Sequence, residues 1–419
     1  MVIGSIIFLT LISYFKFNTL RNPAFYFIII HYLHNFSFSV LKNNGLDIFW
    51  RADPSVDFST MDTIVSFNLI CLWLTSLLLI FFIKKKDNFI TIKKSLRKNK
   101  FCLFIYILFS LIIIYNNRGL VSGNIVYGFD QALDSVSSFD PLARLWNFRV
   151  YFILFYIIFD KPAKKTILYI VLFEFMMSFL LSERKDLSLI LFGLLIVFFN
   201  RKKVRFNFFQ IFGSVILFLS LISLPIYRSF INENGIINKL RLTLDFINDS
   251  SELILYYGTG FVNSEGVQNW TWQLLNGGYL MPLYGLSYVQ ALVNMIILRP
   301  FQPLWLANSQ AAYYFKEVAY PSVTNHGYDF SFTAEAILNF GINGGYISYF
   351  LLSLYIINLY KKKSKNWVFQ RMLIWPILLI SFRTDATSMF RLVSYVLFTP
   401  IIINLIYSFK NVWNRRTSE

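Results

Sequence analysis

Three arginines stand at the ends of apolar segments and could bind an anionic ligand. Arg184 lies in a turn of four successive charged residues, 183–186, between two apolar runs. Arg228 directly follows another apolar run, and Arg383 begins the last short turn of the chain. A guanidinium group binds phosphate oxygens through paired, charge-assisted hydrogen bonds. We therefore predict that these arginines bind a diphosphate.

Two further residues could move a proton. His326 and Glu335 lie near the end of a long mixed segment, just before an apolar run that begins at residue 336. An imidazole or a carboxylate can accept the proton of a sugar hydroxyl, and arginines can stabilise a diphosphate leaving group without a metal ion. These residue types favour glycosyl transfer from a polyprenyl diphosphate, with either His326 or Glu335 as the base.

The composition indicates which elements hold these residues. The chain of 419 residues is 56% hydrophobic and 15% charged, whereas soluble domains carry about a quarter charged residues. Several apolar runs reach the roughly 20 residues that a membrane-spanning helix needs. We predict an all-α, polytopic transmembrane protein with about eleven helices, within a range of ten to twelve. The predicted spans are 1–15, 22–41, 60–83, 101–115, 147–160, 166–182, 187–200, 207–227, 336–360, 367–382 and 388–409.

The distribution of charge predicts the orientation of these spans. The net charge is +17, and the Lys and Arg residues cluster in alternate short connections, as cytoplasmic loops do. This pattern indicates a multi-pass protein of the bacterial inner membrane, with the N-terminus outside and the C-terminus in the cytoplasm. It also argues against a nucleic-acid partner and makes the lipid bilayer the expected environment.

The predicted topology divides the chain into three parts. Residues 1–227 form N-terminal transmembrane helices, residues 228–335 a large periplasmic loop, and residues 336–419 C-terminal transmembrane helices. Within the loop, residues 272–298 are nearly apolar enough to span, but glycines and a proline interrupt them. We expect re-entrant or interfacial helices there, because irregular backbone at membrane depth is tolerated where it lines a cavity. The Tyr and Trp residues of this loop suit the headgroup region or a sugar ring.

Other polar residues within apolar runs have structural interpretations. The two cysteines, Cys71 and Cys102, lie inside apolar runs, which suits small buried side chains, so we predict neither a metal site nor a cofactor. His31 and His34 are interpreted as hydrogen-bonded packing residues. Glu174 is expected to bond a neighbouring helix.

Two motifs and the overall layout resemble a known family. The turn SERKDLSLILFGLLIVF, residues 182–198, and the segment TNHGYDFSFTAEAILNFGINGGYISYFLLSL, residues 324–354, are similar to segments of the Wzy-type O-antigen polymerases, the oligosaccharide repeat-unit polymerases. The many helices with a large loop in the second half also resemble that family.

The resemblance implies a glycosyltransferase that joins undecaprenyl-diphosphate-linked oligosaccharides at the periplasmic face. By the same resemblance, Arg184, Arg228 and Arg383 would bind the diphosphates or acidic sugars, and His326 or Glu335 would activate the acceptor hydroxyl. A chain-length regulator and a flippase would be the protein partners.

Three other functions remain open at this stage. An O-antigen ligase has a similar layout and uses the same donor. A transporter or flippase of lipid-linked oligosaccharide should show duplicated halves and charges deep in its helices, whereas this chain concentrates its charges at one face. A non-enzymatic scaffold would not need outer arginines beside His and Glu.

Overall fold

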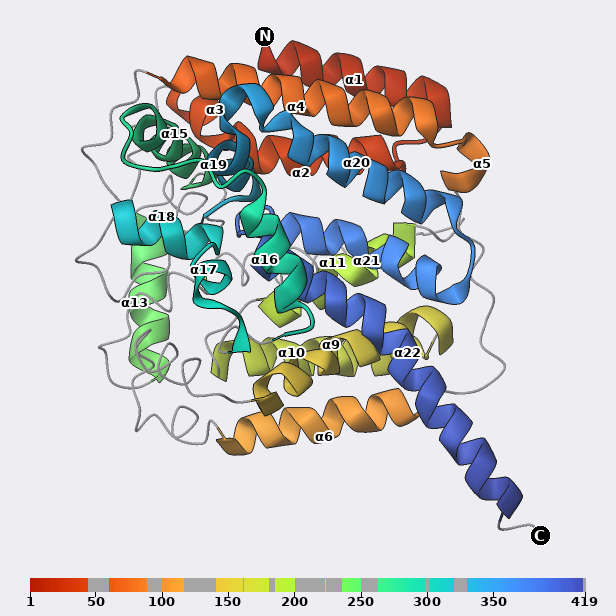
Figure 1. Cartoon of the computed structure of the whole chain (residues 1–419). Helices are drawn as coiled ribbons and strands as arrows, with labels where there is room; N and C mark the ends of the chain where they lie inside the picture. The colour runs from red at the N-terminus through yellow and green to blue at the C-terminus, as the bar shows by residue number, and fades with distance from the viewer. Residues whose placement is uncertain are drawn as a thin grey trace. The chain divides into compact units, whose positions relative to one another are not determined.

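The computed structural model describes residues 1–43, 60–88, 100–116, 141–160, 162–180, 185–199, 223, 236–249, 263–297, 301–319 and 330–416. Every regular element in these residues is a helix. The helices (Figure 1) are α1 (Val2–Phe17), α2 (Pro23–Asn35), α3 (Ser37–Asn43), α4 (Met61–Phe82), α5 (Lys85–Asn88), α6 (Lys100–Asn116), α9 (Pro141–Asp160), α10 (Lys164–Leu180), α11 (Lys185–Phe199), α13 (Ile236–Asp249), α15 (Asn263–Asn276), α16 (Leu286–Asn294), α17 (Leu304–Ala307), α18 (Ala311–Ala319), α19 (Phe332–Gly344), α20 (Tyr346–Lys361), α21 (Lys365–Ser381) and α22 (Ala386–Arg416).

Two of the described helices are long and apolar enough to cross a membrane. They are α4 and the Ala386–Ser408 part of α22, and the bent pair of α19 and α20 would add a third if it forms one span. Helix α1 and residues Phe101–Tyr115 are apolar but shorter. The prediction of an all-helical protein with helices able to span a membrane is thus confirmed in the described residues, while the number of about eleven spans stays a prediction.

The expected single helix over residues 336–360 is broken in the structure. Helices α19 and α20 meet at an angle of 115°. The break begins at Gly341, whose φ of +66° and ψ of −178° belong to a region that essentially only glycine adopts. The cluster Gly341–Gly345 therefore ends α19 inside an otherwise apolar run.

The chain forms two compact units. Unit 1 comprises residues 1–90, 259–363 and 377–392, and unit 2 comprises residues 91–258, 364–376 and 393–419. In unit 1, α4 packs against α1, α2 and α20 (Figure 1). In unit 2, α9 packs against α6 and α11, and α10 packs against α11. The predicted division at residues 227 and 335 concerns membrane topology and stays a prediction.

Helix α15 of unit 1 docks through a row of polar side chains. Glu265 accepts hydrogen bonds from the Phe38 N–H at 2.6 Å, the Ser39 N–H at 3.1 Å and the Ser39 hydroxyl at 2.7 Å. One turn further, the Thr60 hydroxyl bonds Asn269 Oδ1 at 2.6 Å. An acidic group at the start of a helix satisfies N–H groups that have no partner within that helix, so Glu265 fixes the beginning of α3.

The predicted interruption of residues 272–298 is confirmed. Helices α15 and α16 are separated by the irregular segment 277–285, in which Gly278 and Gly285 have φ values of +72° and +87°. The break in α19 leaves two carbonyls without their usual partners within the helix, and this segment supplies donors. The Leu283 N–H donates to the Leu338 carbonyl at 3.1 Å, and the Tyr284 N–H to the Asn339 carbonyl at 3.0 Å.

Candidate functional site

Glu335 lies in the first turns of α19 and is fully buried. Helix α19 begins there because Ser331 has extended backbone and its hydroxyl accepts a hydrogen bond from the Ala334 N–H at 3.0 Å, a favoured N-cap arrangement. Both carboxylate oxygens of Glu335 have donors. The Ser287 hydroxyl donates to Oε1 at 2.5 Å, and the Ala386 N–H donates to Oε2 at 2.5 Å.

Arg383 lies at the same junction, in the turn between α21 and α22. The turn is fixed to the start of α19, because the Phe332 N–H donates to the Phe382 carbonyl at 3.0 Å. The Arg383 side chain is half-buried, and its charge acts on the ring of His34. The structure thus brings together two of the five predicted site residues, which are far apart in the sequence.

Asp385 is a member of this junction that sequence reasoning did not select. It is 3% exposed. Its Oδ1 accepts a hydrogen bond from the Ser388 N–H at 3.0 Å, and its Oδ2 accepts one from Gln310 Nε2 at 2.9 Å. Asp385 therefore caps α22, whose first N–H groups are shared between Asp385 and Glu335. Its position in the sequence could have indicated this role, because Asp is favoured at the N-cap of a helix and Asp385 directly precedes the last apolar run.

Uncharged polar side chains surround the two carboxylates. Asn339 Nδ2 donates to the Ser287 oxygen at 2.7 Å, and the Thr387 hydroxyl donates to Gln290 Oε1 at 2.8 Å. These side chains are buried, as are those of Gln302 and Asn294 nearby. The junction is therefore a polar core held by internal hydrogen bonds.

This geometry gives Glu335 a positioning role in the observed conformation. A general base must lie within hydrogen-bond reach of the proton it removes, and Glu335 is 0% exposed with both oxygens engaged. It instead holds the turn that carries Arg383 against the start of α19. The other predicted site residues, Arg184, Arg228 and His326, lie outside the described residues.

The buried ring of His31 belongs to a second network in unit 1. Its Nε2 lies 2.9 Å from the Asn68 carbonyl, which can only accept, and its Nδ1 lies 3.0 Å from Asn35 Nδ2, which can only donate. The ring is therefore neutral with the proton on Nε2. Asn35 Oδ1 also accepts from Gln268 Nε2 at 2.7 Å and from the Thr333 hydroxyl at 2.8 Å. The interpretation of His31 as a hydrogen-bonded packing residue is confirmed.

Unit 2 contains a buried charged cluster. Arg149 of α9 forms ion pairs with Glu174 of α10 and, at 2.7 Å, with Asp186 of α11. The Tyr106 hydroxyl donates to Glu174 at 2.6 Å, so the expected bond from Glu174 to a neighbouring helix is confirmed. The sequence indicated Arg149 only as a charge within a predicted span. A buried pair such as this fixes which helices are neighbours.

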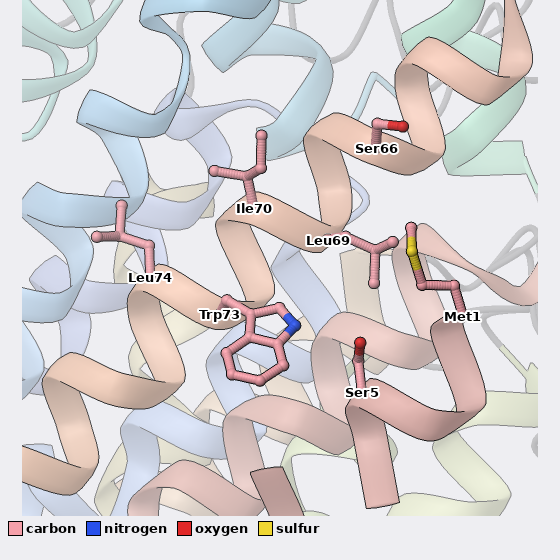
Figure 2. Close-up of a pocket in the computed structure, with 7 residues that line it drawn as sticks. All are labelled: Met1, Ser5, Ser66, Leu69, Ile70, Trp73 and Leu74. Atoms are coloured by element: carbon pink, nitrogen blue, oxygen red, sulfur yellow. The ribbon is translucent and has the colours of Figure 1, made fainter. Parts of the chain in front are cut away.

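An open pocket of about 450 Å³ lies elsewhere in unit 1, between α1 and α4. Figure 2 shows its lining residues Met1, Ser5, Ser66, Leu69, Ile70, Trp73 and Leu74. This lining is almost wholly apolar and includes none of the predicted site residues, so the pocket offers no groups for acid–base chemistry or phosphate binding. Within the described part of the chain, no group of side chains is suited to hold a metal ion.

No protein-family model matches the chain, and neither a curated protein nor a solved structure shows significant similarity to it.

Proposed function

We propose that the protein is a glycosyltransferase that polymerises undecaprenyl-diphosphate-linked oligosaccharide repeat units into O-antigen or a related surface polysaccharide. The observation that carries the proposal is the junction of α19 with the turn before α22. There Arg383, the candidate for binding diphosphate, lies in a turn that hydrogen bonds of Glu335 and Phe332 hold against the start of α19. Arg383 and Glu335 were selected from the sequence for different reasons, Arg383 as a phosphate-binding guanidinium and Glu335 as a titratable carboxylate.

The proposal includes a topology. It takes the chain as a multi-pass protein of the bacterial inner membrane with about eleven spans, a periplasmic segment 228–335 and a cytoplasmic C-terminus. The apolar length of α4 and of Ala386–Ser408 and the basic connections between predicted spans support it. In this orientation the Arg383 turn faces the periplasm, where lipid-linked repeat units would be joined.

The reaction would be a transfer of the growing chain from its lipid to the non-reducing end of a new unit. A base removes the proton of the acceptor hydroxyl, the oxygen forms a bond to the anomeric carbon of the donor, and the bond from that carbon to the diphosphate oxygen breaks. Arg383, with Arg184 and Arg228, would stabilise the departing diphosphate. Because both Glu335 oxygens are engaged, we assign the base to His326 and the positioning of the Arg383 turn to Glu335.

A gel of surface polysaccharide from a strain that lacks the gene tests this function. If the protein is a polymerase, the long ladder is lost from this strain while a single capped repeat unit remains. Loss of every capped species would point to an O-antigen ligase or a flippase. An unchanged ladder would contradict any role in this pathway.

Complementation of that strain tests the role of Arg383. We expect Arg383→Ala to abolish the ladder and Arg383→Lys to restore it only in part, because lysine cannot form the paired bonds of a guanidinium group. Arg391→Ala is the matched control, since Arg391 lies on α22 and is exposed. Immunoblots of membrane fractions would establish equal amounts of each variant, and a normal ladder from Arg383→Ala would contradict the proposed site.

A further inference from the structure

Helix α16 has the reverse of the usual amphipathic arrangement. Its buried side includes the polar residues Ser287, Gln290 and Asn294, whereas Val289 and Leu292 are 48% and 55% exposed. A helix on the surface of a soluble protein buries its apolar side and turns its polar side to water. Helix α16 therefore has the arrangement expected of a helix surrounded by hydrocarbon.

The exposed apolar surface extends beyond α16. It continues through large side chains on both sides of the helix and on α17, with exposed fractions of 45% to 82%. We define the apolar face as Met281, Leu292, Ile296, Phe301, Leu304 and Trp305. Soluble proteins rarely expose a large contiguous apolar patch without a binding partner.

Charge is almost absent from this stretch. Residues 266–315 contain one charged side chain, Arg299. A water-facing segment of this length would carry about a quarter charged residues. The near absence of charged residues thus agrees with the exposed apolar side chains of α16, because neither suits a surface that faces water.

The polar groups behind the apolar face are bonded within the protein. Gln290 accepts from the Thr387 hydroxyl at 2.8 Å, and Gln302 Nε2 donates to the Ile297 carbonyl at 2.8 Å. In the irregular segment before α16, the Leu283 and Tyr284 N–H groups bond carbonyls of α19. Irregular backbone is tolerated at membrane depth when its polar groups are satisfied in this way.

From these observations we infer that the apolar face of residues 281–305 contacts the acyl chains of the lipid bilayer. Tyr279 and Tyr284, which are 72% and 79% exposed, then lie at headgroup level, where tyrosine is enriched. A bilayer fits better than a protein partner, because protein interfaces have a polar rim with hydrogen-bonding groups, whereas residues 266–315 contain one charged side chain. The inference does not depend on the proposed glycosyl transfer.

Fluorescence quenching in liposomes tests this contact. The purified full-length protein would carry one cysteine, at Leu292→Cys or Ile296→Cys, in a Cys71→Ser, Cys102→Ser background, and each cysteine would be labelled with an environment-sensitive nitrobenzoxadiazole dye. Glu317→Cys is the control, because Glu317 is exposed on α18. A sharp elution profile and the emission of the control would establish that the variants are folded.

We expect the dye at 292 and 296 to emit at shorter wavelength, to lose emission to nitroxides on lipid acyl chains and to be unaffected by aqueous iodide. The dye at 317 should show the opposite response. Quenching by iodide at 292 and 296 would overturn the inference, because these sites would then face water. Protection from both quenchers would overturn it equally, since a second protein copy would then cover the face.

Discussion

Replacement of Glu335 tests whether its two hydrogen bonds hold the junction of α19 and α22. Glu335→Ala removes the acceptors of the Ser287 hydroxyl and the Ala386 N–H and leaves both donors in a buried site. A buried donor that is left without an acceptor costs roughly 1–3 kcal/mol. We therefore expect Glu335→Ala to lower the free energy of unfolding of unit 1 by about 2–6 kcal/mol.

Glu335→Gln should cost much less. The amide has nearly the same shape, its oxygen can still accept from the Ala386 N–H, and its NH₂ group can donate to the Ser287 oxygen. We expect a loss of about 0.5–1.5 kcal/mol, the net contribution of one neutral hydrogen bond. Since 1.4 kcal/mol is a factor of ten in an equilibrium constant, the two variants should differ by up to roughly three powers of ten.

The buried thiol of Cys71 in α4 provides the assay. Cys71 is 0% exposed in unit 1, so a maleimide reacts with it only after the structure opens, and under fast reclosing the labelling rate follows the opening equilibrium. A Cys102→Ser background limits the reaction to this thiol. Glu317→Ala is the matched control, because it removes an exposed glutamate from α18. Equal labelling rates for Glu335→Ala and Glu317→Ala would refute the role assigned to Glu335.

Three further predictions concern charge and backbone. Burial raises the pKa of Glu265 to about 8 despite its hydrogen bonds from Ser39 and Phe38, so the folded state holds a proton that the unfolded state releases near pH 4.5. Stability should therefore fall as pH rises from about 4.5 to about 8, and Glu265→Gln should remove that slope from thermal unfolding midpoints. Arg149→Met leaves the buried Glu174 and the partly buried Asp186 without their cation and should cost about 3–5 kcal/mol, measured as faster labelling of Cys102 in unit 2. Gly341→Ala forces a side chain into a conformation with φ of +66° and should lower the unfolding midpoint by the equivalent of about 1–3 kcal/mol. Gly4→Ala, which lies in α1 and meets no atom within 4 Å, should leave the midpoint unchanged or raise it slightly, because alanine favours a helix more than glycine does.

The sequence predicted those helices whose apolar runs have polar ends. Spans 60–83 and 388–409 agree with α4 and with the Ala386–Ser408 part of α22. The interruption before α16 was also predictable, because Gly277, Gly278, Pro282 and Gly285 interrupt an otherwise apolar run. Hydropathy alone, however, could not locate the break at Gly341, since α19 and α20 together are apolar enough for one span despite Asn343, Gly344 and Gly345 after the break.

Contacts between distant residues were beyond sequence reasoning. Glu174 was expected to bond another helix, but its partner Arg149 could be identified only once α9 and α10 were known to be neighbours. Asp385 was visible as part of a turn, yet its role depends on Gln310 and on the start of α22. Conversely, Arg383 and Glu335 could be chosen by residue type because both lie where a predicted outer segment meets an apolar run.

The network around Asn35 has a consequence for biosynthesis. Asn35 lies on the second helix of the chain, and its bonding partner Thr333 follows 298 residues later. A ribosome adds about 5–20 residues per second, so roughly 15–60 s pass before that partner has been made. During this interval the side-chain oxygen of Asn35, which accepts from Gln268 and Thr333 in the folded chain, must find other donors, because an unsatisfied buried polar group costs about 1–3 kcal/mol. Helices α2 and α4 are therefore made long before α15 and α19 complete the polar network that joins them.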